Sequence, residues 1–317
     1  DFELIPNRLD FKHKKTPINT EINKLMNKLN FIDCYEYLNK IKYSSAYRHK
    51  IIKVLLPIYL GFNKSKRLLF IFGVQRSGTS VTFHNLSRLF GVKGYGEFSD
   101  LTALGDEKLR FSSYRRVKNI IIKNLEPFII NKPLVESQVA DIVLKNFDYS
   151  IGIWMYRDYR DVVNSFHKKF GESIGRHHID FIIKGDLNNW RSERVPEKFQ
   201  KLAIDLNKKG LTNHDCTSLY WYIRNSLYFE YQFYNISNLK LVSYEVFVQN
   251  PSHFITKICN LWGYTYKIDP TKLTFNTNSI NRDTLPNIHP EIKELCQDLS
   301  IRLNKEFKNQ GIFNTKH

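Results

Sequence analysis

The chain has 317 residues, of which 42% are hydrophobic and 14% aromatic. This apolar content excludes a disordered protein and suffices for one large domain or two small ones. The formal net charge of +17, from 48 Lys and Arg against 31 Asp and Glu, indicates an anionic partner without identifying it. Nucleic acid, an anionic membrane, a phosphorylated or sulfated substrate and a phosphate-rich cofactor all fit.

Cysteine spacing and hydropathy narrow the class of protein further. The four cysteines lie far apart without a C-x-x-C pair, which gives no support to a zinc or thioredoxin-type site. Buried thiols are the preferred interpretation, and a disulfide between two of them stays open. The longest apolar stretch, 51–62, is interrupted by Lys53 and Pro57 and is shorter than the roughly 20 residues of a membrane span. The compartment stays open between a cytosolic protein, which we slightly favour, and a lumenal domain separated from a membrane anchor.

The predicted elements begin with helices and then change character. Residues 1–65 carry apolar side chains at helical spacing, and we expect a helical N-terminal extension packed on a second domain over 66–317. The run from Arg67 to Phe72 is continuously apolar, ends at Gly73 and predicts a parallel strand buried on both faces. A helix over 77–90 and a short strand over 92–95 follow.

Strands and helices alternate through the rest of the chain. We predict strands over 128–130, 150–156 and 240–243, and helices over 106–124, 139–147, 160–170, 215–234, 251–261 and 290–307. This order predicts an α/β fold with three layers, in which helices cover both faces of a central, mostly parallel sheet. Such folds bind ligands at the carboxyl ends of their strands. Chemistry is therefore expected just after Phe72, Tyr95, Ile130 and Tyr156.

The loop after the first predicted strand has the features of a phosphate-binding turn. It reads Gly73-Val74-Gln75-Arg76-Ser77-Gly78-Thr79-Ser80 and lies between a buried strand and a helix. Backbone N–H groups at such a helix start point toward an anion, and the helix dipole adds to the attraction. In the nucleotide-kinase loop G-x-x-x-x-G-K-[ST], a lysine contacts the β- and γ-phosphates. Thr79 stands at that position, which argues against ATP or GTP hydrolysis, and the cation of this loop is Arg76.

A second candidate anion site follows the strand predicted over 150–156. Arg157 ends this strand, and Ser165 lies eight positions later in the next predicted helix. A strand-end arginine offers a two-pronged fork to a dianion. A serine two helical turns further on faces back toward the same point.

These two loops resemble the motifs of sulfotransferases that use 3′-phosphoadenosine 5′-phosphosulfate (PAPS). Their 5′-phosphosulfate loop commonly reads R-S-G-T-[ST], as in residues 76–80, and their 3′-phosphate motif R-[DN]-[PG]-[RK]-x-x-x-x-S matches 157–165 except at Tyr159. The resemblance implies a P-loop-like fold, PAPS as the donor, adenosine 3′,5′-bisphosphate (PAP) as the product and no required metal. It implies that the nucleotide is bound by Arg76, Ser77, Gly78, Thr79, Ser80, Arg157 and Ser165.

The resemblance also assigns residues between the two loops. Glu97 lies 21 residues after Arg76, where tyrosylprotein sulfotransferases and their carbohydrate and bacterial relatives carry the general base. Lys132 lies 25 residues before Arg157 and resembles the lysine that contacts the transferring sulfate. Lys132 and Arg76 would then offset charge that develops on the transferred and leaving groups. An alignment with the cytosolic enzymes instead places Glu136 near the base, so Glu136 is the second candidate.

Two residues further along complete the predicted nucleotide site. Tyr244, followed by Glu245, resembles a family element whose tyrosine lies near the adenosine, although a strand-end core aromatic explains it nearly as well. Arg282 is a candidate second ligand of the 3′-phosphate.

The predicted function is sulfuryl transfer from PAPS to an acceptor hydroxyl, with Glu97 as base. The acceptor stays open between a glycan, a glycolipid, a tyrosine and a small natural product, and an acidic acceptor would fit the charge. A P-loop kinase that uses ATP is the first alternative, and a basic nucleic-acid-binding protein is the second. The sequence carries no recognised nucleic-acid-binding motif and no predicted membrane span, and it leaves the oligomeric state open.

Overall fold

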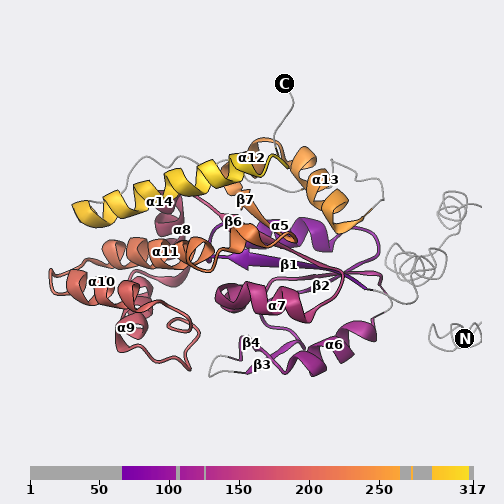
Figure 1. Cartoon of the computed structure of the whole chain (residues 1–317), viewed down its shortest axis with the longest axis horizontal. Helices are drawn as coiled ribbons and strands as arrows, with labels where there is room; N and C mark the ends of the chain where they lie inside the picture. Colours follow the sequence, from indigo (N-terminus) through magenta and orange to yellow (C-terminus); the bar gives the residue numbers. More distant parts are fainter. Residues whose placement is uncertain (1–65, 105–107, 125, 265–272, 274–287, 314–317) are drawn as a thin grey trace, which may run out of the picture. The chain divides into compact units, whose positions relative to one another are not determined.

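The computed structural model describes residues 66–104, 108–124, 126–264, 273 and 288–313 (Figure 1). The predicted helical extension over 1–65 lies outside the described residues. No helix in the described ranges combines the length and the apolar character that crossing a membrane requires. Cys216, Cys259 and Cys296 are buried free thiols, as preferred from the sequence, and Cys34 lies outside the described part.

The core of the fold is a five-stranded sheet in which every neighbouring pair is parallel. In order across the sheet, the strands are β2 (Val92–Tyr95), β5 (Phe128–Asn131), β1 (Arg67–Gly73), β6 (Ser150–Tyr156) and β7 (Leu239–Ser243). The predicted α/β fold with a parallel central sheet is confirmed. The chain reaches β2 and β5 on one side of β1 and then β6 and β7 on the other. In folds of this kind, ligands bind at the carboxyl ends of the strands where such a winding direction reverses, which here is around β1.

Helices cover both faces of this sheet. Figure 1 shows α13 and α14 above the sheet, and α6 and α7 below it. The helices are α5 (Thr79–Ser87), α6 (Tyr114–Ile122), α7 (Ala140–Asn146), α8 (Tyr159–Phe170), α9 (Ile174–Lys184), α10 (Glu197–Asn207), α11 (Asn213–Glu230), α12 (Tyr244–Gln249), α13 (Pro251–Trp262) and α14 (Pro290–Asn309), with short 3-10 turns η1 (Leu134–Val139) and η2 (Phe233–Asn235).

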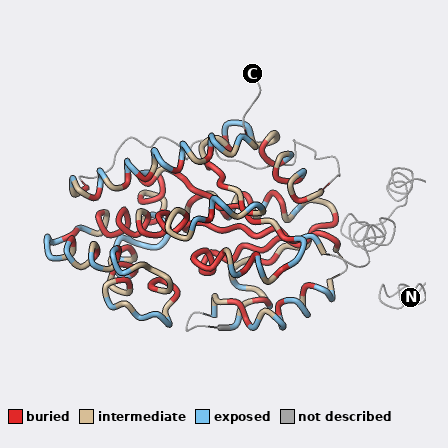
Figure 2. Tube along the Cα trace, in the orientation of Figure 1, coloured by how far each residue is buried: buried red, intermediate tan, exposed pale blue. Residues whose placement is uncertain are grey.

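The central strand is buried as its uninterrupted apolar run predicts. All residues of β1 after Arg67 are buried, and Figure 2 shows the strands of the sheet in red as the buried centre of the molecule. Leu69 pairs with Ile130 of β5 and with Ile151 of β6. Full burial of a side chain of this size contributes about 1.5–3 kcal/mol relative to leaving it exposed. Packing on both faces therefore stabilises the strand from which the first predicted loop starts.

The segment between β2 and α6 differs from the prediction. The expected helix over 106–124 begins only at Tyr114, because Ser113 caps it there by accepting a hydrogen bond from the backbone N–H of Arg116. Upstream, β3 (Thr102–Leu104) and β4 (Arg110–Phe111) form a small antiparallel pair that the sequence did not reveal. The prediction also assigned no structure to 171–214, where the structure has α9 and α10.

Candidate functional site

The loop between β1 and α5 is shaped by two glycines at positive φ. A Cβ atom at Gly73, whose φ is 127°, would lie 2.3 Å from the backbone oxygen of Met155 on β6. A Cβ atom at Gly78, whose φ is 89°, would lie 2.1 Å from Cδ2 of Tyr244. Both positions therefore need glycine for close approach as well as for backbone conformation. The loop packs tightly between β6 and the Tyr244 ring.

The start of α5 has the chemistry of an anion site. Gly78 precedes the helix, and no side chain of the described residues caps it. The first backbone N–H groups of a helix have no partner within it, and they favour an anion. The Ser77 hydroxyl is fully buried and has no hydrogen-bond partner in the described part of the chain. A buried unsatisfied hydroxyl costs about 1–3 kcal/mol, and a ligand rich in acceptor oxygens would satisfy it. The loop therefore fits a phosphate or phosphosulfate group.

The two predicted anion-binding motifs meet in space. The guanidinium Nε of Arg76 donates a hydrogen bond to Ser165 Oγ at 3.0 Å, across 89 positions of sequence. Nη1 of Arg157 donates to the backbone oxygen of Arg76 at 3.3 Å. Burial, and then the neighbouring Arg157, lower the pKa of Arg76 below its usual range. Two cations held this close favour an anion bound between the motifs.

Arg157 is itself held from several sides. It is 5% exposed, and its Nη2 lies 3.4 Å from Oδ2 of Asp161, one turn into α8. The guanidinium stacks over the Tyr244 ring at 4.7 Å from the ring centre. The backbone oxygen of Arg157 accepts a hydrogen bond from Nε1 of Trp221 on α11 at 3.1 Å. The structure therefore brings Tyr244 to the strand-end arginine, whereas Arg282 lies outside the described residues.

Glu97 and Lys132 are brought together by the pairing of β2 and β5. The backbone N–H of Lys132 donates to the oxygen of Tyr95 at 3.0 Å, so the residues after the two strands lie side by side. Nζ of Lys132 lies 3.5 Å from Oε2 of Glu97 and donates to Ser80 Oγ at 3.0 Å. The Lys132 side chain is 10% exposed and that of Glu97 28%. Lys132 thus joins the carboxylate to the first turn of α5.

Glu136 has a different environment from Glu97. It is 3% exposed, and its oxygens accept hydrogen bonds from Nε and Nη2 of Arg110 at 2.8 and 3.0 Å and from the N–H of Phe111 at 2.8 Å. A general base needs a lone pair within reach of the proton that it takes. Three donors already occupy the Glu136 carboxylate, whereas the Glu97 side chain is more exposed and lies 3.5 Å from the Lys132 ammonium group.

Sequence reasoning missed several contacts that support the site. Glu245, the residue after Tyr244, accepts hydrogen bonds from the backbone N–H of Asp158 at 2.8 Å and from Ser243 Oγ at 2.9 Å. Burial raises the pKa of this Glu245 carboxyl, against the effect of the hydrogen bonds. The carboxyl thereby fixes the backbone just after Arg157. The family-like Tyr-Glu pair was the available signal, but its glutamate was not singled out.

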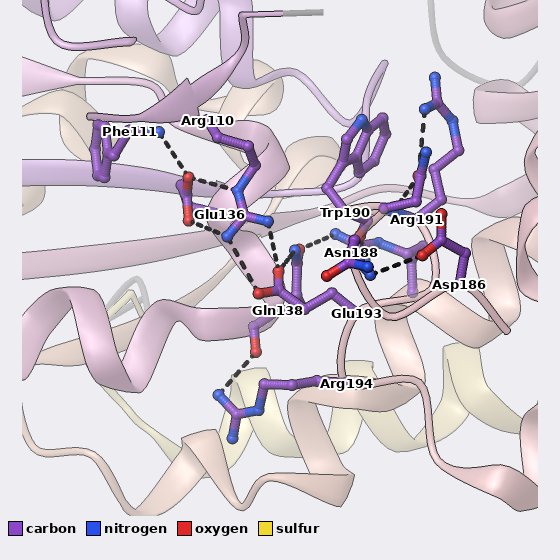
Figure 3. A network of polar contacts seen from close by, with 12 residues as sticks. Arg110, Phe111, Glu136, Gln138, Asp186, Asn188, Trp190, Arg191, Glu193 and Arg194 are labelled. Atoms are coloured by element: carbon purple, nitrogen blue, oxygen red, sulfur yellow. Dashed lines mark hydrogen bonds and ion pairs between the residues drawn. The ribbon is translucent and has the colours of Figure 1, made fainter. Parts of the chain in front are cut away.

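A further polar network lies beside η1 and was not expected from the sequence. Figure 3 shows it extending from Phe111 and Glu136 through Arg110 and Glu193 to Gln138 and the turn around Trp190. Its members come from segments far apart in the chain, and no local pattern marks them. Within the described ranges, no group of three or more His, Cys, Asp or Glu side chains is arranged to hold a metal ion.

Among known proteins, similarity to this chain is found in solved structures and not in family models or curated sequences. No model of a known protein family matches the chain, and no curated protein matches it. Among solved structures, it is similar to a sulfotransferase from Alicyclobacillus acidocaldarius, with a TM-score of 0.44, 14% identity and coverage of 78% of this chain and 96% of the other. It is also similar to the sulfotransferase domain of the Synechococcus PCC 7002 olefin synthase, with a TM-score of 0.42, 16% identity and coverage of 75% and 96%. Both similarities concern the fold alone.

Proposed function

We propose that the protein is a PAPS-dependent sulfotransferase that acts on an acceptor hydroxyl. The observation that carries this proposal is the meeting of the two loops: Arg76 contacts Ser165 at 3.0 Å, and Arg157 contacts the backbone of Arg76 at 3.3 Å. PAPS carries a phosphosulfate at the 5′ position of its ribose and a phosphate at the 3′ position. A pair of adjoining anion sites, each at the carboxyl end of a central strand, suits such a donor.

The donor, when bound, supplies the sulfuryl group, and the chain supplies positioning, proton transfer and charge. The Glu97 carboxylate takes the proton of the acceptor hydroxyl. A bond then forms between the acceptor oxygen and sulfur as the bond from sulfur to the 5′-phosphate oxygen breaks. Lys132 and Arg76 offset the negative charge that collects on the leaving phosphate. The first-turn amides of α5 hold that phosphate in line with the acceptor.

In this proposal, Lys132 serves both the base and the loop that would hold the leaving group. Its ammonium group lies between the Glu97 carboxylate at 3.5 Å and the Ser80 hydroxyl at 3.0 Å. One cation is thereby placed between the proposed base and the loop that would hold the leaving group. Thr79 stands where ATP-binding loops carry their lysine, and we infer that Lys132 brings the ammonium from β5 instead.

The test is transfer of labelled sulfate from PAPS to a panel of sugar, phenol and aliphatic hydroxyl acceptors, with water as the default acceptor. We expect Glu97→Gln to lower the turnover by roughly 10²- to 10⁴-fold, the usual contribution of a positioned general base. PAP affinity should stay nearly unchanged, because Glu97 is not among the residues proposed to bind the nucleotide. The exposed Glu197, paired with Lys201 on α10, provides the matched control Glu197→Gln.

Two results would contradict the proposal at different levels. Full turnover in Glu97→Gln would show that Glu97 is not the general base, and Glu136 would then be the candidate to test. The proposed function itself would be contradicted if the wild-type protein failed to bind PAP and also transferred no sulfuryl group from PAPS to any acceptor or to water.

A further inference from the structure

The segments that carry Glu97 and Lys132 are joined to each other away from the site. The backbone oxygen of Glu97 accepts a hydrogen bond from Thr102 Oγ1 at 3.0 Å, and Thr102 pairs with Phe111 across β3 and β4. The N–H of Phe111 donates to Oε1 of Glu136 at 2.8 Å. Glu136 lies on η1, which follows Lys132 directly along the chain. The segment that carries Glu97 and the segment that follows Lys132 are therefore linked to each other through Glu136.

Arg110 and Glu193 reinforce this junction. Arg110 binds both oxygens of Glu136, and its Nη1 lies 2.9 Å from Oε2 of Glu193. Burial lowers the pKa of Arg110, but its hydrogen bonds and attraction to Glu136 and Glu193 outweigh burial and raise it above its usual range. The guanidinium is thus held between two carboxylates. One of them belongs to η1, and the other to the turn before α10.

Glu193 also reaches η1 by a second route. Its Oε2 accepts a hydrogen bond from Nε2 of Gln138 at 2.6 Å, and the Gln138 oxygen accepts from Nη2 of Arg224 at 2.7 Å (Figure 3). Burial lowers the pKa of Arg224, which is 2% exposed. The Gln138 amide therefore links a buried cation on α11 to the Glu193 carboxylate, and both ends of the amide are engaged.

We infer that Glu193 is a positioning residue for sulfuryl transfer. Its single carboxylate binds Arg110 on the segment that follows Glu97, and Gln138 on the segment that follows Lys132. Glu193 therefore sets the position of the base relative to the ammonium group without touching either. The inference rests on the proposed function for its catalytic meaning, and on the contacts of Glu193 with Arg110 and Gln138 for its structural one. It extends the site into the segment over 171–214.

The first arm of the test uses PAPS and water as the probe, because this turnover needs no identified acceptor. Rates are divided by the number of PAP-binding sites found by calorimetry, so that only correctly folded protein counts. We expect Glu193→Ala to lower kcat by roughly 10- to 100-fold, as small misplacements of catalytic groups do. PAP affinity and the KM for PAPS should stay within about twofold, since the proposed nucleotide ligands lie in the loop before α5, in the first turns of α5 and α12, and between the end of β6 and α8.

Further variants separate positioning from a merely structural role. Glu193→Gln keeps an oxygen that accepts from Arg110 and should retain more turnover than Glu193→Ala. Gln138→Leu breaks the same link from the other side, so the double variant should fall no further than Glu193→Ala alone, within about twofold. Glu197→Ala removes an exposed carboxylate, 76% exposed, a short distance along the chain and should leave kcat unchanged.

The second arm measures amide hydrogen exchange and needs neither nucleotide nor turnover. In Glu193→Ala, exchange over 96–103 and 133–139 should rise by about tenfold or more, because both segments lose a tether, while β1 and β6 keep their protection. Unchanged exchange there, unchanged kcat per site, or an equal loss of PAP affinity would overturn the inference. If the wild-type protein neither binds PAP nor consumes PAPS, the proposed function fails, and the exchange arm still decides whether Glu193 holds the two segments.

Discussion

At the scale of single residues, the Arg157 side chain is held by several groups of the candidate nucleotide site. It reaches the Arg76 backbone, the Asp161 carboxylate and the Tyr244 ring from one buried position. A planar guanidinium makes such simultaneous contacts, whereas the ammonium group of lysine is a point charge without a fork. The geometry of the group therefore matters here as well as its charge.

We predict that Arg157→Lys weakens PAP binding although it keeps the charge. Losing one charge-assisted hydrogen bond costs about 1.5–3 kcal/mol, which corresponds to roughly a 10- to 100-fold higher Kd by calorimetry. Arg160→Lys is the matched control, because Arg160 lies three positions on, is 58% exposed and pairs with Asp158. Equal Kd values for Arg157→Lys and the wild-type protein would contradict the role of the fork.

Some of these residues could be predicted from the sequence, and the reason is physical. Residues that follow parallel strands lie at one edge of the sheet, so Glu97 and Lys132 were expected near the first loop, and they lie there. Glu193 could not be predicted in this way. Its contact with Arg110 spans 83 positions and joins a short hairpin to an irregular turn, neither of which has a periodic pattern.

At the scale of elements, the loop before α5 depends on Gly78 for two separable reasons. Its φ of 89° is unfavourable for any residue with a Cβ atom, and that atom would overlap the Tyr244 ring. Gly210, shortly after α10, has a positive φ of 77° and nothing within 4 Å of a built Cβ. The two glycines therefore separate backbone strain from overlap.

We predict that Gly78→Ala destabilises the protein more than Gly210→Ala. Left-handed backbone costs roughly 1–2 kcal/mol for alanine at either position, and overlap adds about 1–3 kcal/mol at Gly78. Urea unfolding of both variants measures the difference, and PAP binding should fall only in Gly78→Ala. Equal losses of stability would show that the Tyr244 ring moves aside without cost.

The contact between α9 and α11 has a predicted pH dependence. His178 Nδ1 accepts a hydrogen bond from Nε of Arg191 at 2.6 Å, and the ring stacks on Tyr220. Burial, and then Arg191, lower the pKa of His178 well below its usual value. In the unfolded chain, His178 takes up a proton as the pH falls through about 6.5, whereas in the folded chain it stays neutral at that pH. Stability is therefore complete above that pH and is lost as the pH falls toward the folded pKa.

We expect His178→Gln to reduce this acid sensitivity, since glutamine can still accept from Arg191 and does not titrate. Between pH 7 and pH 5, the free energy of unfolding should fall by about 1–2 kcal/mol less in the variant than in the wild-type protein. Urea unfolding at the two pH values measures both changes. An identical change in the two proteins would mean that His178 takes up its proton in the folded state.

The elements themselves were predictable where one pattern dominates. The five sheet strands were expected within a residue or so of their observed bounds. The central strands β5, β1 and β6 are largely apolar runs, as buried parallel strands are. The helix expected over 106–124 was placed too early, since Arg110 and Phe111 form β4, which pairs with β3 upstream and binds Glu136 through Phe111. Tertiary contacts of that kind override local helical preference.

At the scale of the whole molecule, the charge of +17 receives a partial explanation. Arg76, Lys132 and Arg157 gather at the carboxyl ends of β1, β5 and β6, where the parallel sheet reverses its winding direction. Three cations at this edge suit a donor with several negative charges. The surplus beyond them is too widely spread along the sequence to identify the acceptor.

The most direct test of a PAPS-type donor site compares the thermal stabilisation of the protein by PAP with that by ATP and Mg²⁺. A ligand at a concentration of about 100 times its Kd stabilises the folded state by about 2.7 kcal/mol, which a melting curve resolves. We predict that PAP raises the melting temperature of the wild-type protein, that Arg157→Ala abolishes most of this increase, and that ATP with Mg²⁺ gives little. Stabilisation by ATP with Mg²⁺ alone would contradict the assignment and point to a kinase.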